Sequence, residues 1–181
     1  MSVDFAAARD IMVDSQVRTQ DVTDLAIQDA MRAFPREGLV PAGKGWIAYA
    51  DTEIEYAPGR WMLRPRDVAK LLQAIGPRAG ERALAISAPY AGAILSLMGL
   101  SVSRVDARDP VGGTFDVIVC EGAVGRTPVG WPMALTIGGR LGVVERDGPV
   151  GQAHLYFRTA DTIASRAVFD CTPPNMAGFE V

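Results

Sequence analysis

The N-terminal part of the chain, up to residue 75, has hydrophobic positions that repeat with the period of an α-helix. This period predicts helices around residues 4–18, 24–34 and 66–75. Thr23 stands where a side-chain oxygen can cap the second helix. Pro65 suits the first turn of the third helix, because a proline at that position gives up no hydrogen bond. We therefore expect a helical N-terminal section.

After residue 80 the pattern changes to short apolar runs. Residues 83–86 and 115–120 predict two neighbouring central parallel strands, residues 101–105 another strand, and residues 90–98 the helix that precedes it. Runs of this kind belong to a parallel sheet that is covered on both faces. The order of elements therefore predicts the α/β class, with a Rossmann-like sandwich.

The C-terminal third continues with shorter elements. Residues 131–137 are expected to form a short helix, residues 138–139 a tight turn and residues 140–145 a further strand. Residues 153–159 and 164–171 contain β-branched and aromatic side chains and predict an antiparallel pair. The sheet should therefore end in antiparallel strands.

The segment between Asp106 and Phe115 is too short to hold a helix followed by a strand. We therefore expect a further parallel strand and its helix to be missing from this position. Residues 101–105 would then form an open edge of the sheet, and an open edge invites pairing with another chain. A homodimer or a protein partner at this edge is a corollary of that prediction.

Composition narrows the class of protein. Of the 181 residues, 49% are hydrophobic and 22% are charged, and the formal net charge is −3. These values fit one domain over residues 1–181, with a helical section at 1–80 and a sheet section at 81–181. The negative net charge gives no reason to expect a positively charged surface that would attract nucleic acid or a membrane. Residues 1–10 contain no continuous apolar segment, so we expect no signal peptide and a cytoplasmic protein.

Candidate chemistry lies at the ends of the predicted strands. The turn at residues 87–90 reads Ser-Ala-Pro-Tyr, where a nucleotide-binding fold has glycines. We expect no positive φ there, and Pro89 also lacks an N–H group. Asp106 and Glu121 each end a strand. Asp106 is either a ligand of a bound molecule or a loop acid or helix cap, and Glu121 is either an active-site acid or an acceptor for loop N–H groups.

Other polar residues have simpler interpretations. His154 has no nearby Cys or His partner, so we expect no metal site. Cys120 and Cys171 lie in apolar runs and are expected to be reduced and buried. A small basic patch, expected to be a solvated face, consists of Arg60, Arg64 and Arg66.

Several segments resemble a known family. They are Met-Val-Asp-Ser-Gln-Val-Arg at residues 12–18, Val-Thr-Asp at 22–24, Phe-Pro-Arg-Glu at 34–37, Phe-Asp-Val-Ile at 115–118, Glu-Gly-Ala at 121–123 and Gly-Gly-Arg-Leu at 138–141. Through these segments the chain resembles the protein-L-isoaspartate O-methyltransferase family, in the form common in alphaproteobacteria. The resemblance implies a Rossmann-like class I methyltransferase fold, S-adenosylmethionine as cofactor and methylation of isoaspartyl carboxylates.

The resemblance also implies where the cofactor would bind. The implied positions are Ser87, Ala88, Tyr90, Asp106, Glu121 and Gly122. The family's glycine-rich turn falls on residues 87–90, which lack its glycines, and Asp106 matches the acid that holds the ribose hydroxyls. Residues 107–114 cannot supply the strand whose loop encloses the adenine. A family serine near the methyl-transfer path falls on Leu63, so no catalytic residue is assigned.

Three functions remain open. The first is a divergent family member that binds the cofactor weakly or not at all and acts as an interaction or regulatory module; the altered turn and the missing strand favour it. The second is an active S-adenosylmethionine-dependent isoaspartyl methyltransferase with a rebuilt pocket, which the extent of the resemblance favours. The third is a small-ligand binding protein that uses the crevice near Ser87, Asp106 and Glu121.

Overall fold

A computed structural model describes residues 4–181 of the chain. Residues 1–3, which belong to the N-terminal segment expected to lack a signal peptide, lie outside the described residues. The helical section comprises α1 (Phe5–Met12), a π-helical turn (Val13–Val17), a 3-10 turn (Arg18–Gln20), α2 (Leu25–Ala33) and α3 (Pro65–Ile75). The three predicted helices are therefore confirmed. Between α2 and α3 lie two more 3-10 turns (Arg36–Gly38 and Gly45–Ile47) and a hairpin of β1 (Ile54–Ala57) and β2 (Arg60–Met62).

The cap of α2 differs from the prediction. Asp24, and not Thr23, accepts hydrogen bonds from the first N–H groups of the helix, at 2.9 and 3.3 Å. Thr23 lies one residue too early, and its own N–H donates to the side chain of Gln73 on α3 at 2.8 Å. Pro65 is the first residue of α3, as predicted.

The sheet section contains six strands in the order β4-β3-β5-β6-β7-β8. Their bounds are β3 (Arg82–Ile86), β4 (Ser101–Val105), β5 (Phe115–Val124), β6 (Leu135–Arg146), β7 (Gly151–Arg158) and β8 (Ile163–Asp170). The first four strands in space are parallel, and β7 and β8 are antiparallel to their neighbours. Strands β3 and β5 lie side by side, which confirms the prediction for the two central strands.

The start of β6 corrects the prediction for residues 131–139. Helix α5 (Gly130–Met133) is only four residues long, and β6 already begins at Leu135. Gly138 lies inside the strand with φ +82°, and the pairing with β5 shifts its register beside it. Residues 138–139 therefore form an irregularity in a strand, because the left-handed conformation of a glycine can be accommodated in a bulge as well as in a turn.

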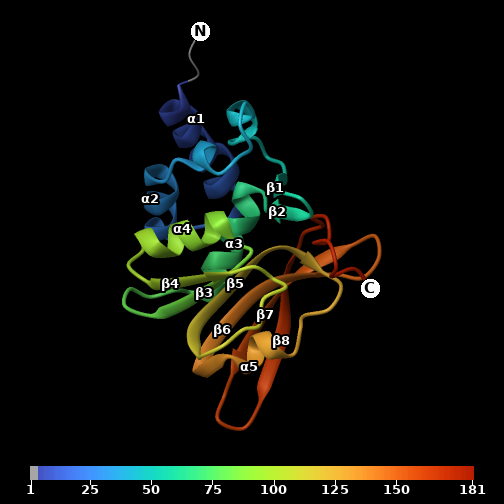
Figure 1. Cartoon of the computed structure of the whole chain (residues 1–181). Helices are drawn as coiled ribbons and strands as arrows, with labels where there is room; N and C mark the ends of the chain where they lie inside the picture. Colours follow the sequence, from blue (N-terminus) through green and yellow to red (C-terminus); the bar gives the residue numbers. More distant parts are fainter. Residues whose placement is uncertain (1–3) are drawn as a thin grey trace.

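The connection from β4 to β5 contains no helix and no strand among residues 106–114. The prediction that a further strand is missing is therefore confirmed, and β4 is an outer strand of the described sheet. Helices α1 to α4 (Pro89–Leu97) lie above one face of the sheet, whereas within residues 4–181 only the short α5 lies below the other (Figure 1). The helical cover of the sheet is therefore unequal.

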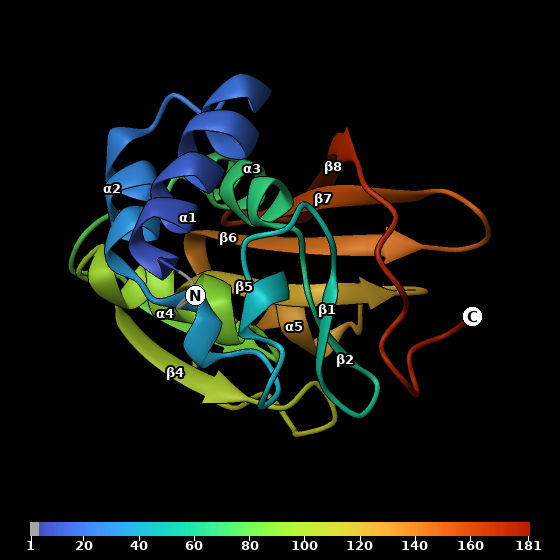
Figure 2. The same cartoon turned by 90° about the horizontal axis from the view of Figure 1, so that it is seen from above.

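The C-terminal tail (residues 171–181) runs along the end of β5 and beside the β1–β2 hairpin (Figure 2). The Met176 N–H donates to the carbonyl of Ala123 at 2.8 Å, and the Ala177 N–H donates to that of Gly59 at 3.1 Å. Met176 is fully buried. The tail thus covers the end of the central strand. Within residues 4–181 we find no helix whose length and apolar character would let it cross a membrane.

Candidate functional site

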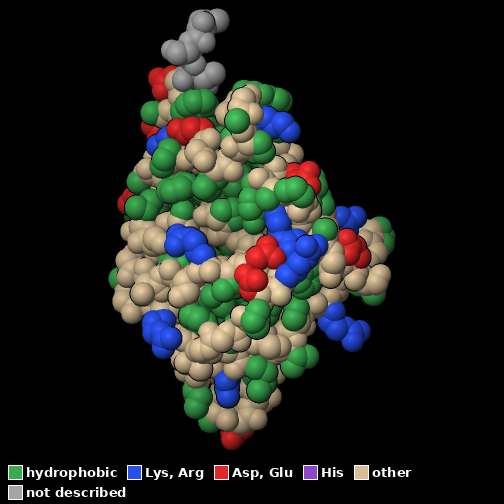
Figure 3. Space-filling view, in the orientation of Figure 1, with side chains coloured by type: hydrophobic (Ala, Val, Ile, Leu, Met, Phe, Trp, Pro, Cys, Tyr) green, Lys and Arg blue, Asp and Glu red, His purple; other side chains and the backbone are tan. Residues whose placement is uncertain are grey.

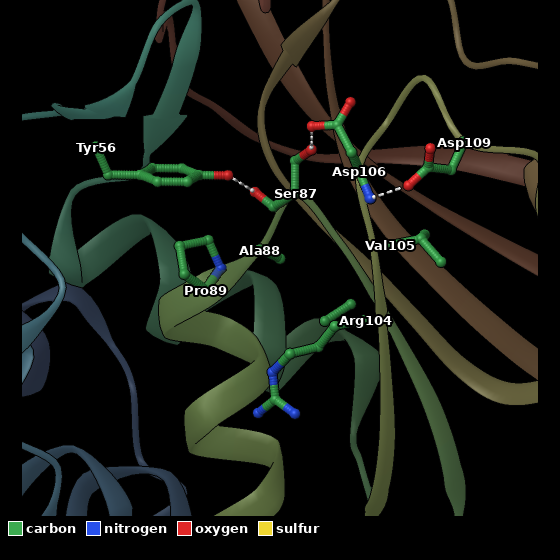
Figure 4. Close-up of a pocket in the computed structure, with 9 residues that line it drawn as sticks. Tyr56, Ser87, Ala88, Pro89, Arg104, Val105, Asp106 and Asp109 are labelled. Carbon is green, nitrogen blue, oxygen red and sulfur yellow. Dashed lines mark hydrogen bonds between the residues drawn. The ribbon is translucent and has the colours of Figure 1, made fainter.

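A pocket of about 380 Å³ lies at the carboxyl ends of β3 and β4, where α/β folds usually bind ligands. Its walls are formed by Tyr56, Ala85, Ser87, Ala88, Pro89, Arg104, Val105, Asp106 and Asp109 (Figure 4). Of the implied cofactor positions, Ser87, Ala88 and Asp106 line this pocket. Tyr90, Glu121 and Gly122 are buried and do not. The crevice expected near Ser87, Asp106 and Glu121 therefore includes only the first two.

Ser87 corrects the expectation for the turn after β3. Its φ is +43°, in the left-handed region that favours glycine. The side chain compensates for the strain, since Ser87 Oγ accepts the Ala107 N–H at 2.9 Å and donates to Asp106 Oδ2 at 3.1 Å. The Tyr56 hydroxyl donates to the Ser87 carbonyl at 3.1 Å. A short polar residue can therefore adopt the backbone conformation for which glycine was expected.

We expect Ser87→Gly to be more stable than Ser87→Ala by about 1 kcal/mol. Both variants lose two hydrogen bonds, each worth about 1 kcal/mol, but only glycine removes the left-handed strain. Urea denaturation of the two variants and the wild type measures the difference. Equal stability of the two variants would show that the backbone strain at residue 87 does not exceed the extra conformational entropy that glycine loses on folding.

The Asp106 carboxylate is fully occupied by this chain's own donors. Oδ1 accepts from Arg60 Nη2 at 2.7 Å and from the Arg108 N–H at 3.0 Å. Oδ2 accepts from Arg60 Nε at 2.7 Å and from Ser87 Oγ at 3.1 Å. A carboxylate offers about four lone-pair positions, and all are used here. The bonds from Arg60 hold the pKa of Asp106 far below its ordinary value.

Arg60 is the site residue whose role the sequence did not reveal. The basic patch was expected to be a solvated face, yet Arg60 is 5% exposed and forms a bidentate pair with Asp106. Arg64 and Arg66 also form ion pairs, with Glu53 and Asp51. Figure 3 shows acidic and basic side chains gathered just below the β1–β2 hairpin. A separation of 46 residues hides the Arg60–Asp106 pair in the sequence.

Glu121 lies under the start of α4. Its side chain is 0% exposed, and Oε2 accepts the N–H groups of Tyr90 at 3.0 Å and Ala91 at 3.4 Å. Burial raises the pKa of Glu121 to about 7, although the charge of Arg36 and the helix N–H groups act in the opposite direction. Of the two interpretations of this residue, the geometry matches the acceptor of N–H groups.

The end of β5 is filled by neighbouring side chains. A Cβ atom at Gly122 would lie 2.8 Å from Met176 Cγ, so the tail packs directly on this glycine. Leu63, which occupies the position of the family serine, is 0% exposed and belongs to the main hydrophobic core. Neither position presents a polar side chain to the pocket.

The remaining candidates are His154 and the two cysteines. No group of three His, Cys, Asp or Glu side chains in residues 4–181 could hold a metal ion. His154 Nε2 lies 3.9 Å from Glu145 Oε2. Cys120 and Cys171 are buried and free, and burial raises the pKa of both thiols.

Comparison with known proteins assigns the family. No family model matches the chain. A protein-L-isoaspartate O-methyltransferase of Methylorubrum populi is 30% identical over 179 residues, which cover 82% of this chain and 84% of the relative. The chain belongs to the protein-L-isoaspartate O-methyltransferase family. A relative of the same name from Methylorubrum extorquens is 36% identical over 111 residues, and there the chain spans about half of the relative, 49% of its length.

Solved structures of this family share the fold. A protein-L-isoaspartate O-methyltransferase superposes with a TM-score of 0.76 at 18% identity, covering 95% of this chain and 67% of the other. A second one, from Plasmodium falciparum in complex with S-adenosyl-L-homocysteine, gives a TM-score of 0.76 at 13% identity and covers 93% of this chain and 97% of the other. The expected Rossmann-like methyltransferase fold is therefore confirmed.

Proposed function

We propose that this chain is a protein-L-isoaspartate O-methyltransferase homologue that no longer binds S-adenosylmethionine usefully and acts as an interaction or regulatory module. The observation that carries the proposal is the saturated carboxylate of Asp106. A ribose hydroxyl could bind there only by displacing one of these donors, and two of the four hydrogen bonds belong to the bidentate ion pair with Arg60, a strong charge-assisted interaction. The residues present therefore do not fit the cofactor.

Two further features support this proposal. The N–H groups of Tyr90 and Ala91 at the start of α4 already donate to Glu121, so they are not free for a ligand. The nine residues between β4 and β5 include no strand that could enclose an adenine. Methyl transfer from a sulfonium to a carboxylate depends chiefly on positioning in a closed site, so loss of the cofactor site removes the activity as well.

We expect isothermal titration of the wild type with S-adenosylmethionine to give a dissociation constant of about 1 mM or weaker. Loss of about 4 kcal/mol of contacts converts a micromolar site to a millimolar one. We also expect Asp106→Ala to bind no more weakly than the wild type, and isoaspartyl peptides not to be methylated. Saturable binding below about 100 μM in the wild type, abolished by Asp106→Ala, would overturn the proposal.

An active isoaspartyl methyltransferase is the second candidate. The left-handed φ of Ser87 and the pocket beside Asp106 favour it, because both lie where a ligand binds in folds of this type. This candidate requires a ligand hydroxyl to displace one of the donors to Asp106, and Arg60 supplies two of the four hydrogen bonds. It predicts that Arg60→Ala tightens S-adenosylmethionine binding, which the same titration measures.

A small-ligand binding protein is the third candidate. The pocket of about 380 Å³ favours it, since its walls combine apolar residues such as Pro89 and Val105 with the charged Arg104 and Asp109. Thermal unfolding distinguishes this candidate from the first two. It predicts that a small molecule other than S-adenosylmethionine raises the melting temperature of the protein, whereas S-adenosylmethionine does not.

A further inference from the structure

Three buried polar atoms near the start of α4 have no hydrogen-bond partner within residues 4–181. They are Nη1 of Arg36, the hydroxyl oxygen of Tyr90 and Oε1 of Glu121, and each of the three residues is 0% exposed. Buried polar atoms in folded proteins nearly always have partners. Three such atoms on elements that pack together mark a place that can hold a polar group.

The Arg36 side chain supplies a buried positive charge to this place. Its guanidinium carbon lies 4.4 Å from the centre of the Tyr90 ring. Nε and Nη2 each donate to a backbone carbonyl at 2.9 Å, those of Ala48 and Leu63, and Nη1 is the donor that remains. None of these contacts is with a carboxylate. The buried guanidinium is therefore stabilised by backbone carbonyls and an aromatic ring, without a direct ion pair.

The start of α4 supplies a second source of positive potential. The first N–H groups of a helix are unpaired within the helix and attract anions. In α4, which is nine residues long, Ala88 at the cap position makes no side-chain bond. The N–H groups of Tyr90 and Ala91 are instead satisfied from β5, by Oε2 of Glu121.

We propose that Arg36, Tyr90 and the first N–H groups of α4 form a buried carboxylate-binding site, and that the side chain of Glu121 is its built-in occupant. One carboxylate oxygen rests on the helix N–H groups. The charge of Arg36 and the N–H group of Leu63 both stabilise the ionised carboxylate. Small free carboxylates such as formate are the ligands that fit once the Glu121 side chain is shortened.

This site is separate from the pocket beside Asp106, and the proposal does not depend on whether S-adenosylmethionine binds. If the proposal is correct, the buried side chain of Glu121 fixes the start of α4, and with it the turn at residues 87–90. In a fold that depends on an external ligand, the same N–H groups would face that ligand. Here they donate to the side chain of Glu121.

The test is rescue of Glu121→Ala by formate at about pH 8. With a dissociation constant near 10 mM, about 100 mM formate should raise the melting temperature of this variant by about 4 °C more than that of the wild type. Sodium chloride at the same concentration is the control for ionic strength. The double variant Glu121→Ala with Arg36→Met should lose the rescue, because the charge that holds the ligand is gone.

Equal formate effects in the wild type and Glu121→Ala would overturn the proposal, and so would rescue that persists without Arg36. If Glu121→Ala does not fold, carbon-13 NMR of the Glu121 carboxyl group gives a second test. Its titration midpoint should rise in Arg36→Met and change little in Arg36→Lys, which keeps the charge. An unchanged midpoint in Arg36→Met would show that Arg36 does not act on this carboxylate.

Discussion

Raising the pH from 4.5 to about 7 is expected to lower the free energy of unfolding by about 3 kcal/mol through Glu121 alone. Burial raises the pKa of this carboxyl from its ordinary value of 4.5 to about 7 in the folded protein. The folded state then holds a proton that the unfolded state releases, so the stabilisation is complete below pH 4.5 and is lost as the pH rises through about 7. A tenfold change in the acid dissociation constant corresponds to about 1.4 kcal/mol.

Urea denaturation between about pH 4 and pH 8 measures this dependence, and Glu121→Gln is the matched control because it keeps the shape without a titrating proton. Burial also raises the pKa of Tyr56, Tyr90 and Cys120, so these neighbours stay neutral in this range. Asp67, with a pKa raised to about 6 by burial, adds a slope in the same direction at lower pH. A slope above pH 6 that persists in Glu121→Gln would contradict the assignment.

The architecture follows from local patterns that are strong in this chain. The apolar runs at β3 and β5 predicted buried strands, and their neighbouring parallel pairing is observed. The nine-residue distance between β4 and β5 was enough to predict that no helix and strand lie between them. These features depend on sequence spacing, which a single sequence contains in full.

The site was less predictable because it depends on partners that are far apart in the chain. Nothing near Arg60 in the sequence indicates that its guanidinium reaches Asp106. The sequence alone therefore led us to expect Arg60 on a solvated face. The left-handed backbone of Ser87 was also missed, because it depends on the tertiary hydrogen bonds of its hydroxyl. Glu121 could be identified as an acid at a strand end, but its burial under α4 comes from the packing of the helix.

Replacement of Leu63 by serine is expected to destabilise the protein by about 3 to 4 kcal/mol without producing methyltransferase activity. Leu63 is 0% exposed in the main core, and truncation of a buried leucine typically costs about 2–5 kcal/mol. The new hydroxyl would also need a hydrogen-bond partner in an apolar site. The backbone carbonyl of residue 63 is not a free partner, because it already accepts a hydrogen bond from Arg36 Nη2 at 2.9 Å.

The experiment pairs urea denaturation with a methylation assay on an isoaspartyl peptide. Leu63→Ala is the matched control, since it creates a similar cavity without the hydroxyl, and the difference between the two variants gives the cost of the buried polar group, expected to be about 1 kcal/mol. We expect no methylation from either variant, because the serine would restore one group while Arg60 still occupies Asp106. Methylation by Leu63→Ser and not by Leu63→Ala would show that the cofactor site works and that the lost hydroxyl alone keeps the wild type inactive.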